Sequence, residues 1–409
     1  WLAGTALLHS AIVVEKRDAL KSWTIFLAIL AFSFSLLGTF LVRSGALTSV
    51  HAFATDPTRG VFILFLLCIA VGGSLTLYAW RAPTLKGGGL FQPISREGAL
   101  IFNNVLLSIA AAMVLLGTLY PLLLETLTGE KISVGAPFFN ATFVPIMTPV
   151  IIAMAFGPMM PWKRADLFAV MGKLKIALSV AAVVVLVTLW LSGGPAFALF
   201  GMGLAAWLFV GSILEWAGRI KLFRAPFATS LRRMRDLPRS AHGTMLAHAG
   251  VAIVVAGITG SQAWTQESVQ SLGIGESAHI ADHRFTLSDI REYQGPNFVA
   301  REATVTITTP GERTIVLTPE KRVYTVEGMP TTEAGIRSGF TGDIYAVIGD
   351  QDESGKWITR FYVKPMIPWM WAGGLVMVFG GLMSLSDRRY RIGAPVRSHK
   401  ASAKPAPAE

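Results

Sequence analysis

The sequence predicts an all-α polytopic membrane protein that carries one inserted antiparallel β domain, and three observations lead to this fold class. Of its 409 residues, 52% are hydrophobic and only 15% are charged, and the mean hydropathy is +0.53. About nine apolar segments approach or exceed the length that crosses a bilayer core of roughly 30 Å. One long polar region, 263–365, interrupts these segments and contains short alternating runs. This composition excludes an ordinary soluble domain.

The apolar segments account for the membrane part of the prediction, because in length and composition they match helices that span lipid. They are Trp1–Val14, Trp23–Val42, Val61–Trp80, Ala99–Leu124, Phe143–Met160, Ile176–Leu191, Pro195–Trp216, Gly243–Gln262 and Trp369–Leu385. The first is too short for a span, and it opens the chain without an initiator Met. We therefore expect the sequence to be a fragment that lacks an N-terminal part, including half of this first helix.

The order of these segments predicts four parts. Residues 1–262 form a transmembrane helical core, 263–365 a β domain, 366–386 the final transmembrane helix and 387–409 a tail rich in Ala and Pro. Short alternating runs between turn residues are the signature of strands. In the β domain they are HRFTLSDIREY, REATVTITT, RTIVLTP, KRVYTV, DIYAVIGD and KWITRFYVK.

The net charge of +11 is explained by membrane orientation, and it gives no reason to expect a nucleic-acid partner. Lys and Arg gather in every second loop between the apolar segments. These basic loops lie at 16–21, 81–96, 163–173, 219–239 and 388–391. Because cytoplasmic loops carry such an excess, the β domain and the loop that contains His51 are expected on the external side, and the tail in the cytoplasm.

Cysteine usage limits the chemistry of the chain. The one cysteine, Cys68, lies inside an apolar segment, and no C-x-x-C-H motif is present. The chain therefore forms no disulfide within itself and attaches no haem covalently to itself. Any thiols must come from a partner.

His9 and His248 are candidate metal ligands, because each lies inside an apolar segment. His9 precedes the charged run EKRDALK, and His248 follows the basic run RRMRDLPRSAH. Each is about 9 Å from its charged flank at 1.5 Å per helical residue. An ionisable side chain at such a depth usually faces a partner in the protein, and two imidazoles at matched depth suit a haem iron. The alternative is that each histidine packs between helices and bonds a carbonyl or hydroxyl group.

His51 is the third candidate, in the external loop LVRSGALTSVHAFATDPTRG. Arg43 and Arg59 flank it in a class of loops otherwise poor in cations. Their guanidinium groups suit carboxylates, and haem propionates are carboxylates. The alternative is a loop histidine without a role. The remaining histidines predict no metal site: His242 lies at the cytoplasmic mouth, and His279 and His283 lie on strand or turn.

Five stretches spread over nearly the whole chain carry a family resemblance. They are WLAGTALLHS, LGTFLVRSGALTSVHAFATDPTRG, LAHAGVAIVVAGITGSQ, MPTTEAGIRSGFTGDIYAVIGD and KPMIPWMWAGGLVMVFGGLMSLSDRRYR. These stretches resemble the CcmF/NrfE family, the large membrane subunit of the bacterial cytochrome c haem lyase. In that family a tryptophan-rich WWD segment precedes a stretch like WLAGTALLHS, so this segment and the first external histidine are expected upstream of Trp1.

The resemblance implies a role for each candidate residue. His9 and His248 match two transmembrane histidines that bind a resident haem b. His51 matches the second external histidine, the catalytic position that helps to ligate the haem transferred from the chaperone CcmE. Arg43 is then expected to bind a propionate. The implied location is the bacterial inner (plasma) membrane, with the β domain in the periplasm.

The implied activity is thioether formation between haem vinyl groups and the cysteines of an apocytochrome c C-x-x-C-H motif. The expected partners are CcmH, CcmI, holo-CcmE and apocytochrome c, with membrane lipid around the helices and quinol as a candidate electron donor. Two other functions are left open by the residues alone. One is a haem or small-molecule permease, suggested by the Pro/Gly-broken segment FVPIMTPVIIAMAFGPMMP. The other is a quinol-linked cytochrome b that only carries electrons.

Overall fold

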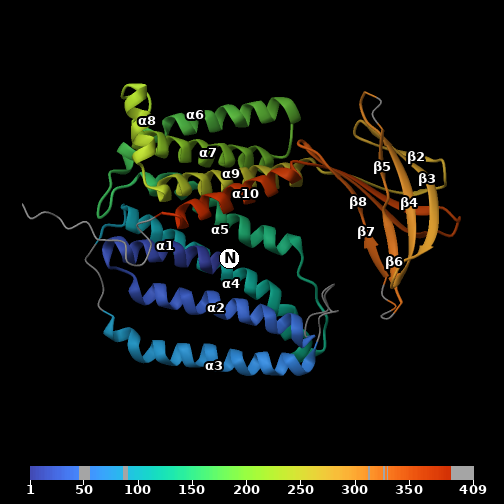
Figure 1. Ribbon diagram of the computed structural model, residues 1–409, viewed down its shortest axis with the longest axis horizontal. Helices are drawn as coiled ribbons and strands as arrows, with labels where there is room; N and C mark the ends of the chain where they lie inside the picture. The colour runs from blue at the N-terminus through green and yellow to red at the C-terminus, as the bar shows by residue number, and fades with distance from the viewer. Residues whose placement is uncertain (46–55, 86–90, 312–313, 326–327, 329, 388–409) are drawn as a thin grey trace, which may run out of the picture. The chain divides into compact units, whose positions relative to one another are not determined.

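The chain is divided into two compact units, Trp1–Leu178 and Ser179–Glu409. The structure is a computed structural model, and it describes residues 1–45, 56–85, 91–311, 314–325, 328 and 330–387. The first unit is helical, and the second combines helices with a β domain (Figure 1).

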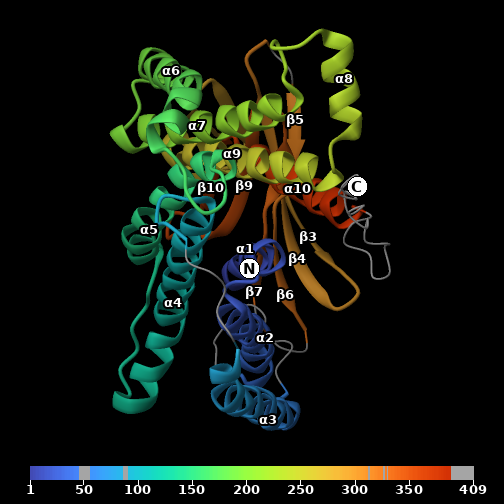
Figure 2. The same ribbon diagram turned by 90° about the vertical axis from the view of Figure 1, so that its left-hand side faces the viewer.

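Over the residues that the structure describes, the first unit contains five helices and two short 3-10 turns. Their bounds are α1 Leu2–Arg17, α2 Lys21–Ser44, α3 Pro57–Arg81, η2 Ala82–Thr84, α4 Arg96–Thr128, α5 Ala136–Phe156 and η3 Gly157–Met159. Neighbours in space follow the order α3, α2, α1, α4, α5 (Figure 2). Ala6, Leu27 and Leu107 meet where α1, α2 and α4 pack together. The short helix α1 therefore lies between two long helices.

The described part of the second unit contains three long helices and one short helix. Their bounds are α7 Ala196–Ile220, α8 Phe227–Asp236, α9 Arg239–Trp264 and α10 Ile367–Leu385, and α6, Leu167–Ser192, runs across the boundary between the units. Helix α9 packs against both α7 and α10. The short α8 runs crosswise to α7 and α9 (Figure 1). It is basic in its last turn, where Arg233 and Arg235 lie.

Eight of these helices are long and apolar enough to cross a membrane, counted over the residues that the structure describes. They correspond to eight of the nine predicted segments, and the predicted fold class is confirmed. Helix α1, with 16 residues, is shorter than a span. Two local predictions were wrong. Lys173, placed in a loop, lies inside α6 because it is near the start of the helix, where its long, exposed side chain can carry the charge outwards. The amphipathic α8 falls in a stretch interpreted only as a basic loop.

The described residues of the β domain form ten strands. Their bounds are β1 Gln266–Leu272, β2 Ser277–Ile280, β3 His283–Gln294, β4 Phe298–Thr308, β5 Thr314–Leu317, β6 Glu320–Tyr324, β7 Pro330–Glu333, β8 Gly335–Ser338, β9 Gly342–Gln351 and β10 Trp357–Pro365. All six of the alternating sequence runs form strands. The short β7 and β8, each of four residues, and the first two strands were not predicted.

Two antiparallel sheets pack face to face in this domain. One has the order β1-β10-β9-β8, and the other has the order β2-β3-β4-β6-β7, with β5 paired to β4. Alternation along β4 buries Ala303, Val305 and Ile307 on one face. Phe285 and Phe361 stack across the core with ring centroids 4.8 Å apart. The apolar face of each sheet is therefore buried against the other.

The helices and the β domain of the second unit are joined by short connections. Strand β1 begins two residues after α9 ends at Trp264, and α10 begins two residues after β10 ends at Pro365. Gln266 and Val363 are paired, so β1 and β10 form an antiparallel ribbon. The Trp369 indole also donates a 3.0 Å hydrogen bond to the Phe340 carbonyl at the turn between β8 and β9.

Candidate functional site

His9 lies at the edge of the buried stripe of α1. The fully buried residues of this helix, Ala3, Ala6, Ser10 and Val13, recur every three or four positions, which is the spacing of one helix face. The Ser10 hydroxyl lies 2.7 Å from the Thr24 hydroxyl of α2. Thr24 donates its own hydrogen to the Leu20 carbonyl, so Ser10 is the donor. This bond fixes the rotation of α1 and places the half-buried His9 beside α4.

Asn103 of α4 holds one ring nitrogen of His9. Its amide nitrogen Nδ2 is 2.8 Å from Nδ1 of His9. The amide NH₂ group is a donor only, so Nδ1 accepts and the neutral ring carries its proton on Nε2. Nε2 makes no hydrogen bond to any residue that the structure describes. One nitrogen of His9 is therefore oriented by the protein, and the other is left for a further partner.

Helix α4 has two more buried polar groups within five residues of Asn103, the amide of Asn104 and the hydroxyl of Ser108. Asn104 is 1% exposed, and its Oδ1 lies 3.5 Å from Nδ2 of Asn103. Neither Nδ2 of Asn104 nor the Ser108 hydroxyl has a hydrogen-bond partner within the described ranges. Buried donors are rarely left unpaired, so this part of α4 is unusual for a helix whose role is packing alone.

A buried ion pair closes the basic end of the first unit. The Glu97 side chain, 1% exposed, accepts a 2.6 Å bond from the Arg17 guanidinium and a 2.8 Å bond from the Lys163 backbone N–H. Ser95 caps α4 through the Gly98 backbone N–H. The pair joins the last residue of α1 to the first turn of α4, so it holds the two helices that carry His9 and Asn103 in register.

His248 belongs to α9, whose opposite side is pressed against α10. Gly250 faces this seam, because a Cβ atom there would lie 2.7 Å from the Gly373 carbonyl oxygen. The converse holds for Gly373, where a Cβ atom would lie 2.6 Å from the Gly250 carbonyl oxygen and 2.7 Å from the Val254 nitrogen. His248, half-buried, is two residues before Gly250 and so lies about 200° around the helix. It therefore projects from the side of α9 that faces away from α10.

His9 and His248 occupy similar depths along their own helices. His9 lies eight residues before the end of α1 at Arg17, and His248 lies nine residues after the start of α9 at Arg239. At 1.5 Å per residue these separations are about 12 Å and about 14 Å. Both helix ends are basic. His9 is in the first compact unit and His248 is in the second.

His242 is fully engaged in hydrogen bonds, which distinguishes it from His9. The Trp216 indole donates to its Nδ1 at 3.0 Å, and its Nε2 lies 3.0 Å from the Met234 carbonyl. An indole N–H is only a donor, so Nδ1 accepts and Nε2–H donates to the carbonyl. His242 therefore ties α9 to α7 and α8, and neither ring nitrogen is available to a metal.

His51 lies outside the described residues, but the ends of its loop are described. The Asp56 backbone N–H donates a 2.9 Å bond to the Arg43 carbonyl, which joins the end of α2 to the start of α3. Arg59 is 72% exposed in its side chain and forms an ion pair with Asp56 at 3.2 Å. Asp56 also caps α3 by accepting from the Arg59 backbone N–H. Both flanking arginines are therefore placed at the mouth of the His51 loop.

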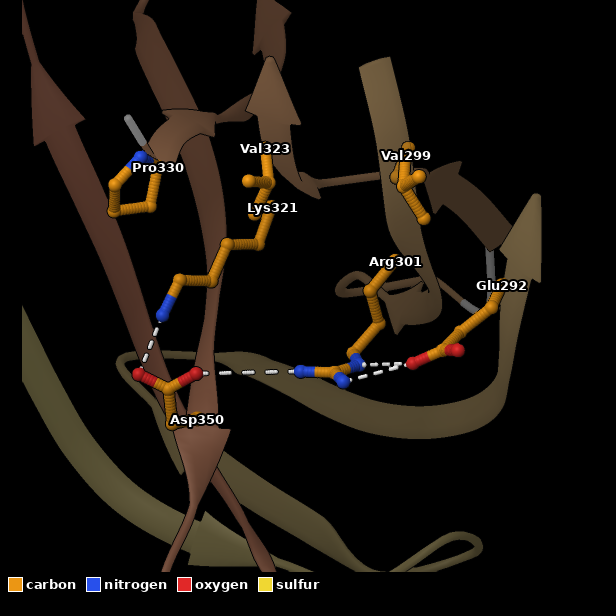
Figure 3. A pocket seen from close by; sticks show the side chains of 8 residues that line it. Glu292, Val299, Arg301, Lys321, Val323, Pro330 and Asp350 are labelled. Atoms are coloured by element: carbon orange, nitrogen blue, oxygen red, sulfur yellow. Dashed lines mark hydrogen bonds and ion pairs between the residues drawn. The ribbon is translucent and has the colours of Figure 1, made fainter. Parts of the chain in front are cut away.

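The β domain offers a shallow hollow of about 300 Å³ but no charge left over for a ligand (Figure 3). Arg301 bonds Glu292 at 2.7 Å, and Lys321 bonds Asp350, so the two acids and two bases that line the hollow neutralise one another. The hydrogen bond from Lys321 holds the pKa of Asp350 below its usual value. These pairs link β3, β4 and β6 of one sheet to β9 of the other, which is a structural role.

The two histidines of this domain do not form a metal site. His279 of β2 is exposed and pairs in register with Arg284, whereas His283 of β3 pairs with Ile280. No group of three or more His, Cys, Asp or Glu residues suited to a metal ion occurs in the described part of the chain.

Asn103, Asn104 and Glu97 were not predicted from the sequence. The two asparagines interrupt an otherwise apolar run, FNNVLLSIAAA, and a polar residue in such a run is a signal of an internal partner. Glu97 is an acidic residue in a basic loop, and only the folded arrangement shows that Arg17 is its partner.

Comparison with known proteins gives one family-model match and several long similarities. The model described as the CcmF C-terminal beta-sandwich matches residues 263–365. The chain is 51% identical to the cytochrome c-type biogenesis protein CycK of Bradyrhizobium diazoefficiens over 97% of this chain and 60% of that protein. It is 44% identical to CcmF of Pseudomonas aeruginosa, over 98% of this chain and 60% of that protein. For CcmF of Escherichia coli the identity is 43%, over 96% of this chain and 59% of that protein.

A solved structure is also similar over most of the chain. It is the "Cytochrome c Heme Lyase CcmF", with a TM-score of 0.72, 27% identity, and coverage of 94% of this chain and 58% of that one. The chain thus spans about three-fifths of the length of the curated relatives it matches.

Proposed function

Since the chain belongs to the CcmF family of cytochrome c-type biogenesis proteins, we propose that it is part of a membrane haem lyase. This lyase attaches haem to the cysteines of apocytochrome c. The observation that carries the proposal is the pair His9 and His248, two histidines at similar depth from the basic ends of apolar helices. In this assignment each imidazole would bind the iron of a resident haem b.

The donor set supports a haem rather than a bare metal ion. A porphyrin already supplies four ligands to its iron, so two imidazoles would complete the coordination. A structural zinc site would need three or four protein ligands together, and the described residues contain no such group. When bound, the haem supplies one-electron transfer, which would keep the iron of the transferred haem reduced, with quinol as the candidate donor. The chain's own contribution is to hold and orient the imidazoles.

The transferred haem is a substrate, and His51 is the residue proposed to ligate it. Each thioether bond forms when a cysteine S–H adds across a haem vinyl group, so S–C and C–H bonds form and the step consumes no oxidant. The thiols belong to apocytochrome c, because the sole cysteine, Cys68, lies among apolar residues in the middle of α3. Arg43, and with it Arg59, would pair with propionates. Catalysis then rests on positioning of two substrates.

This role needs partners and a defined orientation. We assign holo-CcmE as the haem donor, with CcmH and CcmI handling apocytochrome c. The β domain and the His51 loop would face the periplasm of the bacterial inner membrane. The alternation of basic and non-basic loops along the chain supports this orientation, since the basic α8 precedes α9 and the β domain follows it.

Cysteine labelling should report this orientation. In a Cys68→Ala background, Glu353→Cys in the exposed turn before β10 should react with a membrane-impermeant maleimide in whole cells. The matched position is Ala228→Cys on α8, which should react only after the inner membrane is opened. Labelling with the opposite pattern would invert the proposed topology.

Replacement of His51 tests the lyase function itself. In the full-length protein, His51→Ala should leave the resident-haem spectrum unchanged and reduce c-type cytochromes to the level of a deletion strain. The reason is that the described ends of its loop lie beyond α2, whose 24 residues place them about 36 Å from the Lys21 end near His9. Haem-stained gels measure the cytochromes, and spectra measure the resident haem. Normal cytochrome levels would remove His51 from the reaction. His279→Ala, on the exposed face of β2, is the matched control and should behave as wild type.

A further inference from the structure

The contact between Asn103 and His9 has a chemical consequence for ligand binding. In the structure Nδ2 of Asn103 donates to Nδ1 of His9 at 2.8 Å, so Nε2 carries the ring proton. A protonated Nε2 has no lone pair for iron. In this arrangement Nε2 is a donor, so it cannot bind iron until the ring proton moves to Nδ1.

Rotation of the Asn103 amide by half a turn would favour the other tautomer of His9, with the ring proton on Nδ1. The terminal torsion of asparagine is broad and roughly two-fold, so Oδ1 can occupy the place of Nδ2. Oδ1 then accepts from Nδ1–H of His9, and the proton that leaves Nε2 is recovered on Nδ1 with no net change in charge. Nε2 now offers its lone pair, and Nδ1–H is held by an acceptor, as is usual for histidines that ligate metals.

Asn104 supplies the reason for a coupled rotation. Its side chain is 1% exposed, its Oδ1 faces Nδ2 of Asn103 at 3.5 Å, and its own Nδ2 has no partner among the residues described. If both amides rotate, Nδ2 of Asn104 faces Oδ1 of Asn103, and the unpaired N–H group passes from Asn104, which is 1% exposed, to the less deeply buried Asn103, which is 9% exposed. The buried place that Nδ2 of Asn104 now occupies would then hold Oδ1 of Asn104. A carbonyl oxygen tolerates the lack of a partner better than an N–H group does.

We propose that Asn103, backed by Asn104, is a positioning residue that selects the tautomer of His9 and thereby opens Nε2 to a haem iron. The inference rests on the proposed role of His9 as a haem ligand. It adds a two-state side-chain pair, with one state for the haem-free protein and the other for the haem-bound protein.

Substitutions in the full-length holoprotein test this pair through the midpoint potential and the rate of haem loss. Asn103→Leu removes the acceptor, so the affinity for haem should fall roughly 10–100-fold, the usual effect of losing a hydrogen bond to a ligating histidine. Haem should therefore be lost faster, and the potential should rise. Asn103→Asp provides an acceptor to Nδ1–H, strengthens the imidazole as a donor and should lower the potential. Asn104→Asp also replaces an amide with a carboxylate. This carboxylate would accept from Nδ2 of Asn103 and hold that amide in its present orientation, so haem binding should weaken.

Ser108→Ala is the control, since it removes a buried hydroxyl of α4 one turn beyond Asn104 and should alter neither quantity. Wild-type potential and haem retention in Asn103→Leu would overturn the inference, as would a potential that moves in the same direction in Asn103→Leu and Asn103→Asp. If Asn103→Leu does not insert, the sign of the shift in Asn103→Asp decides alone. The proposed function fails separately, by retention of haem in His9→Ala.

Discussion

Replacing Gly373 and Gly380 together with alanine should separate α10 from α9 and strongly destabilise the second unit. A Cβ atom on Gly373 meets backbone of Gly250 and Val254 at 2.6 and 2.7 Å, and one on Gly380 meets backbone of Gly243 and Ala247 at 2.7 and 2.8 Å. Backbone cannot move aside as a side chain can. Overpacking of this kind costs about 1–3 kcal/mol per site, and the sites, about 10 Å apart along the helix, should add to about 2–6 kcal/mol.

The adjacent glycines provide a matched comparison. At Gly374 and Gly381 an added Cβ atom would have no neighbouring atom within 4 Å, so Gly374→Ala with Gly381→Ala should be neutral or slightly stabilising, because alanine favours helix more than glycine does. The measurement is the thermal unfolding midpoint of the purified protein in detergent. Equal midpoints for the two double variants would show that the α9–α10 seam does not depend on close backbone approach.

The membrane helices were predictable because length and apolarity are sufficient to define them. A segment in lipid must pair all its backbone groups internally, so an apolar run such as 196–216 can only become a helix such as α7. The helix ends were less predictable. Helix α6 begins at Leu167, nine residues before the predicted start, because residues near a helix end can carry charges that reach water.

In the β domain, the long strands were predictable and the short ones were not. Long alternating runs such as 343–350 correspond to strands, here β9, because alternation reports burial on one face. Strand β7, Pro330–Glu333, buries no residue completely, so its sequence carries little alternation. It is a strand because β6 pairs with it, from Glu320↔Glu333 to Val323↔Pro330, and this pairing is not visible in the pattern of four residues taken alone.

For the candidate site, the positions of the histidines along their helices were predictable, but their hydrogen-bond partners were not. Depth along a helix follows from counting residues, so the similar depths of His9 and His248 could be predicted. The partner of His9 could not, because Asn103 lies 94 residues away and only the packing of α1 on α4 brings the two together. The opposite case is His242, whose bonds to Trp216 and the Met234 carbonyl satisfy both nitrogens and mark it as a structural histidine.

Replacing either His9 or His248 with alanine should abolish binding of the resident haem while the protein still inserts in the membrane. Each variant would remove one of the two imidazoles proposed to bind the iron, and a low-spin bis-histidine haem needs both. Neither side chain is fully buried in its unit, so a gross loss of folding is not expected. His242→Ala is the matched control on α9, six residues before His248, and it should retain haem.

The reduced-minus-oxidised visible difference spectrum of the purified full-length protein tests the central claim most directly. The wild type and His242→Ala should show the sharp bands of a low-spin b-type haem at the same haem-to-protein ratio, and His9→Ala and His248→Ala should show none. A wild-type spectrum in either of the last two variants, at normal expression, would contradict the assignment of His9 and His248 as the ligands of a resident haem.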